Sequence, residues 1–433
     1  MPQRIFLHVG SPKTGTTFIQ NVLWSGRQVA RQQGLLLPLG TFHDHFLASV
    51  DVRELSSLEQ FPPRAVGIWD RLAEEAHAWN GDVLVSHELF AGATAEQAAR
   101  AVKSLGDTEV HVIVTARDLE RQIPAEWQEH IKHRSTMTFT EFIHDLRTHA
   151  PKSGWFWTVQ DCADVCRRWG AAVPPGNTHV VTVPRDAAPD LLWTRFATLV
   201  GLDPARFELE SSPANTSLHA EQAELLRRVN IQLGDRLPMP GPYPQTVKDV
   251  LAQSLLAARP GTPVGLVGDD RQFAVARSRV IVDELRQLDV DVVGDLIDLL
   301  PADDSGPARG VTELPETMPD SVLLRESVEA LSGLLERFGA ERDRAADADG
   351  NRHPLESELS RCRGELDGLR ARHDALQAHD DKLVHDMRYR PIRHLVIGVS
   401  ERRPWLMRIR VGYWRTANAV RRVTSRTRSD RTG

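Results

Sequence analysis

The feature that most constrains the fold is a regular alternation of short apolar segments with longer amphipathic ones. Four short segments are rich in Val, Ile and Leu, at residues 4–9, 82–86, 109–115 and 178–183. Patterns with helical periodicity lie between them, at residues 16–32, 65–79, 94–104, 120–133 and 158–169. Buried strands that alternate with helices form a parallel sheet with helices on both faces. We therefore predict an α/β fold, a three-layer sandwich with a mostly parallel central sheet.

The chain divides into four regions by pattern. Helical periodicity continues after the fourth strand, so residues 1–300 are expected to form one catalytic domain. Residues 301–320 carry Pro, Gly, Asp and Ser without periodicity, which indicates a linker. Apolar residues in 321–387 recur at steps of three and four, as in coiled-coil helices. Around a break at Gly350, these helices either fold back as an antiparallel hairpin or pair two chains.

The last region, residues 388–433, is strongly basic. It has thirteen arginines and two acidic residues, so the net charge of −6 leaves −17 on the first 387 residues. Leu406 and Ile409 lie at helical spacing between arginines, with Trp405 and Trp414 nearby. This composition is typical of a basic amphipathic tail on an anionic membrane surface. A solvated basic tail is the alternative, and nothing else in the chain resembles a nucleic-acid-binding module.

Cysteine usage and the N-terminus predict the compartment. The three cysteines, Cys162, Cys166 and Cys362, have no framework spacing, which favours a reducing environment. The chain shows no signal peptide, and no apolar run approaches the roughly 20 residues that span a bilayer. We therefore expect a cytoplasmic protein that is at most peripheral on the inner membrane face.

Residues 8–17, with the sequence HVGSPKTGTT, resemble a phosphate-binding loop whose lysine is in an unusual place. In the common nucleotide loop the lysine follows the last glycine, whereas Lys13 precedes Gly15. Gly10 and Gly15 permit a tight turn that presents several N–H groups to one anion. The helix that follows begins with two threonines and adds the positive end of its dipole. The loop is therefore expected to bind an anion.

Two further predicted strands end in residues that can transfer a proton or bind an anion. The second predicted strand ends in Ser86-His87-Glu88 and the third in Ala116-Arg117. Ligands of open parallel sheets bind beyond the carboxyl ends of the strands. We therefore expect the loop, the His-Glu pair and the arginine to share one edge of the sheet.

The run Pro-Lys-Thr-Gly-Thr-Thr after an N-terminal strand resembles the loop of the sulfotransferases that use 3′-phosphoadenylyl sulfate as donor. The resemblance covers roughly residues 1–300, is closest to the bacterial members, and implies their P-loop-like fold. In that family the loop holds the 5′-phosphosulfate. The resemblance therefore implies donor binding by Ser11, Pro12, Lys13, Thr14, Gly15, Thr16 and Thr17.

The family's second motif holds the 3′-phosphate with an Arg-Asp/Asn-Pro segment and a serine eight residues after the arginine. Arg117 stands at the arginine position of this motif. Leu119 replaces the proline, and Ala125 occupies the position of the serine. Arg121 or Gln128 on the following helix would have to supply the missing contact. The third motif of the cytosolic eukaryotic enzymes does not occur in the sequence.

Transfer to a hydroxyl group needs a general base within hydrogen-bond reach. His87 matches in position the catalytic histidine of the family's Lys-Thr-His segment, while other members use a glutamate, for which Glu88 is the candidate. Neighbours at a strand end point to opposite faces, so one of the two is expected to enter the site. His45, in Phe-His-Asp-His-Phe, is a third candidate.

These features together predict a sulfotransferase that moves a sulfuryl group to the hydroxyl of a carbohydrate, a glycolipid or another small molecule. Lys13 would neutralise charge on the leaving oxygen of an in-line displacement, without a metal. A phosphate-loop kinase is disfavoured because no Gly-Lys-Ser/Thr and no clear magnesium aspartate follow. A non-catalytic adaptor acting through its coiled coil is the remaining alternative, and the missing serine near Arg117 favours it.

Overall fold

A computed structural model describes residues 2–55, 61–185, 189–209, 217–239, 241–301, 314–402, 405–409, 411–412 and 414–415 of the chain. The chain divides into two compact units, Met1–Arg337 and Phe338–Gly433. The strands and the predicted site residues all belong to the first unit.

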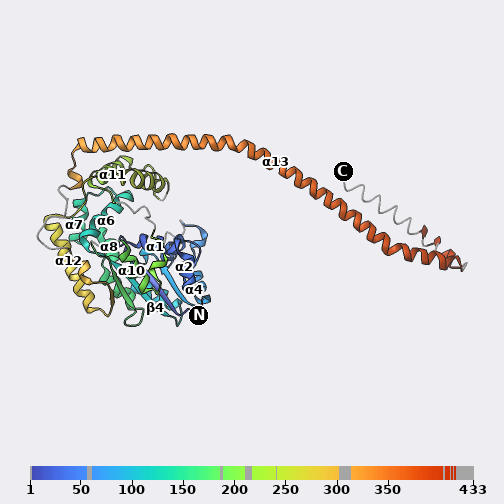
Figure 1. Ribbon diagram of the computed structural model, residues 1–433, viewed down its shortest axis with the longest axis horizontal. Helices are drawn as coiled ribbons and strands as arrows, with labels where there is room; N and C mark the ends of the chain where they lie inside the picture. Colours follow the sequence, from blue (N-terminus) through green and yellow to red (C-terminus); the bar gives the residue numbers. More distant parts are fainter. Residues whose placement is uncertain are drawn as a thin grey trace. The chain divides into compact units, whose positions relative to one another are not determined.

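A six-stranded parallel sheet forms the centre of the first unit (Figure 1). Its order is β2 (Leu35–Leu36), β3 (Asp82–Ser86), β1 (Arg4–Gly10), β4 (Glu109–Ala116), β5 (Thr178–Thr182) and β6 (Asp291–Val293). Each neighbouring pair is parallel. The predicted α/β class with a parallel sheet is confirmed. Because β1 lies between β3 and β4, the three strands that end in candidate site residues are neighbours.

Helices cover both faces of the sheet, as side-chain alternation along β1 requires. Phe6 faces a core built with α1 (Thr16–Ser25), α2 (Arg27–Gln32) and α10 (Pro189–Leu199). Ile5, Leu7 and Val9 face the larger core on the other side. That core includes residues of α3 (Phe42–Val52), α4 (Ile68–Ala78), α5 (Ala95–Ser104), α6 (Leu119–Lys132), α7 (Phe139–Arg147), α8 (Gly154–Gln160), α9 (Cys162–Gly170), α11 (Ala220–Leu233), α12 (Gly268–Gln287) and the π-helix η6 (Pro244–Leu256).

Two predicted helices are each divided in the structure. The helix expected over 16–32 is interrupted at Gly26, where a Cβ would lie 2.4 Å from Phe207 Cδ1. The helix expected over 158–169 begins earlier and is interrupted at Asp161, whose side chain accepts the N–H of Asp164 and caps α9. Among the described strands and α-helices, β2, β6, α3 and α7 were not predicted.

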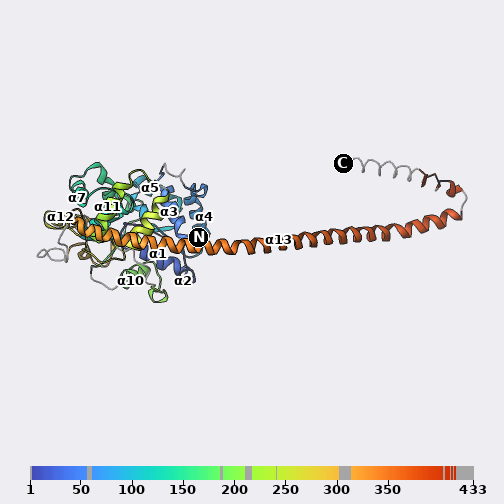
Figure 2. The ribbon, with the colours of Figure 1, turned by 90° about the horizontal axis from the view of Figure 1, so that it is seen from above.

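The C-terminal helix α13 (Asp320–Glu401) is a single helix (Figure 1, Figure 2). It runs through Gly350 without a turn, so the predicted alternative of an antiparallel hairpin is wrong. Its first turns pack on the first unit, where Leu323 and Ala330 are buried. Glu326 accepts hydrogen bonds from Gln222 (3.0 Å) and Arg259 (2.6 Å). The first unit therefore extends into α13.

Parts of two predicted regions lie outside the described residues. These are residues 302–313 of the predicted linker and most of the basic tail beyond residue 402. Within the described part of the chain, no helix combines the length and the apolarity needed to cross a membrane.

Candidate functional site

Two glycines shape the β1–α1 loop, which spans residues 10–15. Gly10 has φ 118°, and a Cβ there would lie 2.7 Å from the carbonyl oxygen of Glu88. Gly15 has φ 86°, and a Cβ there would lie 2.5 Å from Leu192 Cδ2. Residues with a side chain rarely adopt such φ values, so both positions need glycine. The chain turns sharply at both ends of the loop as a result.

Hydrogen bonds to β4 hold the floor of the loop. The N–H of Ser11 donates to the carbonyl of Thr115 at 2.9 Å. The buried Thr14 hydroxyl donates to the carbonyl of Ser11 at 2.6 Å, and its oxygen lies 2.5 Å from Thr115 Oγ1. Ser11 and Thr14 therefore fix the shape of the loop. Both were predicted as donor-binding residues, and the Thr14 hydroxyl is used internally.

Two buried amide side chains hold the other side of the loop. The Gln122 amide, on α6, donates to the carbonyl of Pro12 and to Gln160 Oε1 (2.6 Å). The Gln160 amide, at the end of α8, donates to the same Pro12 carbonyl at 3.2 Å. We call Gln122 and Gln160 the amide clamp. It was not predicted, because a glutamine in a helix carries no sequence signal for a contact 110 or 148 residues away.

The loop leaves several hydrogen-bond donors without an acceptor. Within the described chain, no acceptor is found for the backbone N–H groups of Lys13, Thr14 and Gly15. The buried Ser11 hydroxyl also has no partner among these residues. Such groups beside the first turn of a helix form a site for an anion. Of the two threonines at the start of α1, Thr16 is buried and Thr17 is exposed.

Lys13 is paired with a carboxylate that the sequence did not indicate. Its Nζ lies 2.5 Å from Glu129 Oε2, and the other oxygen of Glu129 lies 2.8 Å from Lys248 Nζ on η6. Burial raises the pKa of Glu129, but Lys13 and Lys248 outweigh it and hold that pKa well below its ordinary value. The carboxylate is therefore ionised at neutral pH and bridges two lysines.

A third lysine adds to the positive charge at this place. Lys132 lies on α6, three residues after Glu129, and is 3% exposed. Its charge interacts with Glu129, Lys13 and Lys248. Burial, and then the two other lysines, lower its pKa to about 8, against the attraction of Glu129. Three lysines thus surround one bridging carboxylate. We call Lys13, Lys132 and Lys248 the lysine cluster.

Arg117 follows β4 and is a partly buried cation without a carboxylate partner. Its Nη1 donates to the carbonyl of Lys13 at 3.2 Å, and its Nε has no acceptor among the described residues. No carboxylate in the described part of the chain lies within 4.0 Å of its guanidinium, by contrast with Arg121. Burial, followed by repulsion from Arg121, lowers its pKa to about 10. An unpaired buried guanidinium beside the loop is suited to bind an anion.

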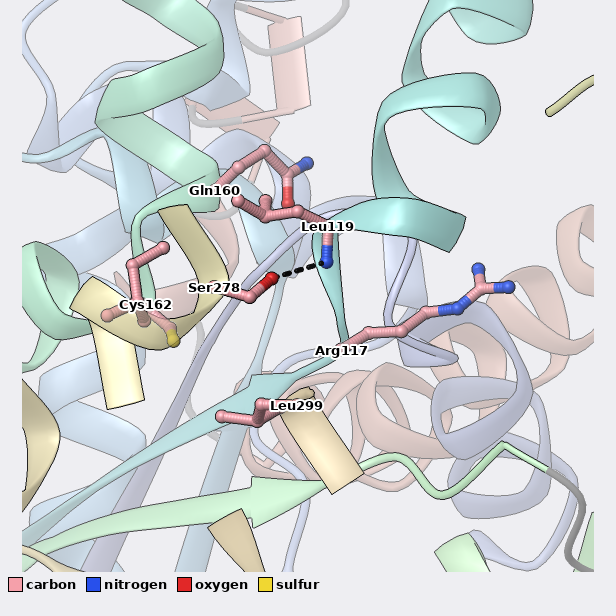
Figure 3. Close-up of a pocket in the computed structure, with 7 residues that line it drawn as sticks. Arg117, Leu119, Gln160, Cys162, Ser278 and Leu299 are labelled. Atoms are coloured by element: carbon pink, nitrogen blue, oxygen red, sulfur yellow. Dashed lines mark hydrogen bonds between the residues drawn. The ribbon is translucent and has the colours of Figure 1, made fainter. Parts of the chain in front are cut away.

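Arg117 is also one of the residues that line a small cavity (Figure 3). Its lining includes Leu119, Cys162 and Ser278, and Leu119 N–H donates to Ser278 Oγ at 3.5 Å. The cavity holds about 10 Å³, close to the volume that one water molecule needs. Figure 3 shows the guanidinium of Arg117 extending away from the other labelled side chains. This cavity is too small for a nucleotide, and the charged end of Arg117 faces elsewhere.

Arg121 and Gln128, the predicted substitutes for the missing serine, are both hydrogen-bonded within the protein. The Arg121 guanidinium pairs with Asp118 and donates to the carbonyls of Pro184 (3.1 Å) and Val183 (2.8 Å). These contacts engage the guanidinium of Arg121, and its role in place of the serine stays a prediction. Gln128 is buried, and its Oε1 accepts the N–H of Leu218 at 2.8 Å. Ala125 offers no polar atom and lies about one helical turn before Glu129.

His87 and Glu88 both lie beside the loop and interact electrostatically with each other. His87 Nδ1 accepts the N–H of Leu89 at 3.2 Å, so the proton of the neutral ring is on Nε2. Burial is the main cause that lowers the pKa of His87. Burial raises the pKa of Glu88, but the charge on His87 and a 3.0 Å hydrogen bond from Gln20 bring it below its ordinary value. Glu88 is therefore the ionised proton acceptor of the pair.

His45 is a structural residue, contrary to its prediction as a base. Its Nε2 lies 2.9 Å from the carbonyl of Pro38, and its Nδ1 accepts the N–H of Ser86 at 3.2 Å. It is fully buried, and burial lowers its pKa to about 4. With both nitrogens engaged, the ring joins α3 to the end of β3 and has no lone pair for a substrate.

Comparisons with known proteins give little further information. No model of a known protein family and no curated protein matches the chain. The structure is similar to the crystal structure of a sulfotransferase from Alicyclobacillus acidocaldarius, with 15% sequence identity and a TM-score of 0.33. The similarity covers 55% of this chain and 95% of that chain. A likeness at this level does not identify a function.

Proposed function

We propose that this protein is a sulfotransferase that moves the sulfuryl group of 3′-phosphoadenylyl sulfate to an acceptor hydroxyl. The observation that carries the proposal is the set of unused donors at the sheet edge. The N–H groups of Lys13, Thr14 and Gly15 lack acceptors in the described chain, and Arg117 next to them lacks a carboxylate. The likeness of the loop sequence to a phosphosulfate loop selects the anion.

The charges suit a nucleotide with phosphates at both ends. Loop N–H groups and Lys13 would hold the 5′-phosphosulfate, and Arg117 would hold the 3′-phosphate without help from a side-chain hydroxyl, because Ala125 has none. In-line sulfuryl transfer spreads negative charge over the equatorial and leaving oxygens. Lys13 would neutralise that charge, and removing such a donor typically costs about 100- to 1,000-fold in rate.

Glu88 is our candidate for the general base. Its pKa is lowered, so the carboxylate is ready to accept a proton at neutral pH, and Gln20 orients it. His87 supports Glu88 electrostatically and lies against the rings of Phe42 and Phe46. Those rings give this side of the site an apolar wall that suits the ring face of a sugar or another small organic acceptor.

The structure gives a specific reason to rank the kinase second. Asp118, two residues after the end of β4, is a candidate magnesium ligand by its place at the sheet edge. Both of its oxygens are used, by Arg121 and by Arg185 (2.8 Å), and it also caps α6 through the N–H of Arg121. An aspartate held in this way is not available to a magnesium nucleotide.

Calorimetry tests the proposal with adenosine 3′,5′-bisphosphate and, separately, ATP with magnesium. We expect the bisphosphate to bind and the Lys13→Met variant to lose at least tenfold in affinity. Lys103→Met, which removes an exposed lysine on α5, is the matched control and should bind normally. Binding of magnesium ATP alone would favour the kinase, and binding of neither nucleotide would favour the adaptor.

The chemistry is tested separately with a donor labelled by radioactive sulfur. The donor is incubated with the protein and with fractions of a cell extract that contain carbohydrates, glycolipids or small hydroxyl compounds. Label should appear in one of these classes with wild-type protein and not with Lys13→Met. Labelling that persists in Lys13→Met would contradict the assigned role of this lysine.

A further inference from the structure

The second compact unit has a row of exposed apolar side chains along one side of α13. Leu359, Leu366, Leu369 and Leu376 are 52%, 48%, 59% and 64% exposed. Their spacing of seven, three and seven places them on one face of the helix, and Cys362 falls on the same row. An isolated helix gains nothing from leucines in water, so this row is built to be covered.

Heptad positions follow from this spacing. With Leu359 at position a, the row occupies a and d throughout, with Cys362 at d and His373 at a. Polar and charged residues fill the remaining positions of the segment 358–376 apart from Gly and Ala. A row of this width matches the seam of a two-stranded coiled coil rather than the wider face that packs on a globular body.

The charges beside the seam indicate which partner covers it. The g positions hold Glu358, Glu365 and Arg372, and the e positions hold Arg363 and Arg370. In a parallel pair in register, each g residue faces the e residue five positions later on the other helix. Glu358 would then face Arg363, and Glu365 would face Arg370, on both sides of the seam. Opposite charges meet at each of these places.

An antiparallel pair of the same segment has less favourable electrostatics. In that orientation g residues face g residues and e residues face e residues, so the e arginines would meet arginines, while the g positions hold two glutamates and Arg372. Within the single helix, Glu358 and Glu365 lie 3.7 and 4.0 Å from Arg361. These exposed pairs are weak, so they do not hold the glutamates away from a partner.

We propose that a second copy of this chain covers the row, and that residues 358–376 of the two copies form a parallel coiled coil in register. This arrangement places Cys362 opposite Cys362 of the second copy across the seam. The inference rests on the helix alone and does not depend on the proposed sulfotransferase activity.

Mass and cross-linking measurements on the full chain test the proposal. Light scattering after gel filtration should give twice the mass of one chain at micromolar concentration. Mild oxidation should give a cross-linked dimer that reducing agent reverses and that Cys362→Ser abolishes, since Cys162 and Cys166 are buried. A monomer, or a dimer that does not cross-link at Cys362, would overturn the proposal.

Charge exchange tests the orientation directly. Glu365→Arg places like charges opposite Arg370 and should weaken dimerisation at least tenfold in low salt. The double variant Glu365→Arg with Arg370→Glu restores opposite charges and should recover the dimer. Failure of the double variant to recover would overturn the parallel register. An unchanged thermal transition of the first unit in both variants confirms that folding is not affected.

Leu366→Lys with Leu369→Lys tests the seam. These changes place charges at a and d and should give a monomer with an intact first unit. A dimer that survives them would show that another surface joins the chains and would also overturn the proposal.

Discussion

At the scale of single side chains, the positive charge of Lys13 is balanced by Glu129, a residue 116 positions away in the sequence. Glu129 pairs with Lys13, and Lys248 shares the same carboxylate. An anion that binds to the loop competes with Glu129 for Lys13. Glu129 therefore stabilises the fold at the expense of affinity for the ligand, a compromise that is common at binding sites.

Glu129→Gln should separate these two effects. Without the carboxylate the lysines repel one another, so the free energy of unfolding should fall by about 1–3 kcal/mol. Affinity for adenosine 3′,5′-bisphosphate should rise severalfold, because the competing charge is gone. Denaturant unfolding and calorimetry measure the two quantities, with Glu96→Gln on the exposed start of α5 as control. A fall in both stability and affinity would contradict the compromise.

Glu88 and His87 should differ sharply when each is replaced. Glu88→Gln should lower the transfer rate by about 100- to 10,000-fold, as expected for loss of a general base. His87→Asn keeps an acceptor for the Leu89 N–H and should cost less than tenfold. Because the pKa of Glu88 is lowered from an ordinary value that already lies well below pH 6, the wild-type rate should not fall between pH 8 and pH 6. A rate that survives Glu88→Gln but not His87→Asn would reverse the assignment.

At the scale of elements, the loop is positioned by the strands and helices on both sides. β1 provides its start, β4 and the amide clamp hold its floor and side, and Leu192 of α10 fills the space beside Gly15. The conformation of Gly15 also sets the direction in which α1 begins. The geometry of the loop thus depends on packing at a residue without a side chain.

Gly15→Ala should therefore be unfavourable for two reasons, a strained backbone at residue 15 and a steric clash of the added Cβ. At φ 86° an alanine costs about 1–2 kcal/mol in any surroundings, and here its Cβ would also overlap Leu192. Gly34→Ala is the matched control, because φ is 89° and no atom lies within 4 Å of the added Cβ. Both variants should be destabilised, but only Gly15→Ala should lose bisphosphate affinity, by at least tenfold. Equal affinities in the two variants would refute this.

Element patterns explain which parts of the site were predictable. The strand ends at residues 86–88 and 117 were located correctly, because buried strands with β-branched residues are distinct in the sequence and β1, β3 and β4 are adjacent. β2 and β6 have two and three residues, too few to show a period. Glu129 and Lys248 lie on separate helices, and only the tertiary fold brings them to Lys13.

The helix α3 illustrates a different kind of failure. Its start has a capping box between Thr41 and Asp44, which is a recognisable signal. The histidines within α3 resemble catalytic residues in the sequence, and on that ground His45 is predicted as a candidate general base. The structure shows that the ring of His45 is buried and fully hydrogen-bonded. Local sequence does not distinguish a buried histidine from a catalytic one.

At the scale of the whole molecule, buried histidines couple folding of the first unit to pH. His8 lies at the centre of the sheet between Ser86 (2.8 Å) and Thr115 (3.3 Å), and burial lowers its pKa to about 4. His45 has the same lowered pKa for the same reason. In the unfolded chain both have a pKa near 6.5, so unfolding takes up protons below that pH.

Stability of the first unit should therefore decrease as the pH falls from 6.5 to 4. The loss is about 3 kcal/mol for each histidine whose pKa is lowered by this amount. Denaturant unfolding at a series of pH values measures it, and His8→Gln should flatten the curve. His144→Gln on the exposed side of α7 should leave the curve unchanged. A flat curve for the wild-type protein would contradict the pKa directions.

The amide clamp has a consequence for how the site responds to its surroundings. Gln122 and Gln160 carry no charge at any pH, so their hydrogen bonds to the Pro12 carbonyl depend on acidity and salt less than charged contacts do; Gln160 also donates to Glu126 at 3.4 Å. Lys132 and Arg117, whose pKa values burial lowers to about 8 and about 10, are sensitive to both. A change of pH or salt concentration should therefore alter the affinity of the β1–α1 loop for an anion more than it alters the conformation of the loop.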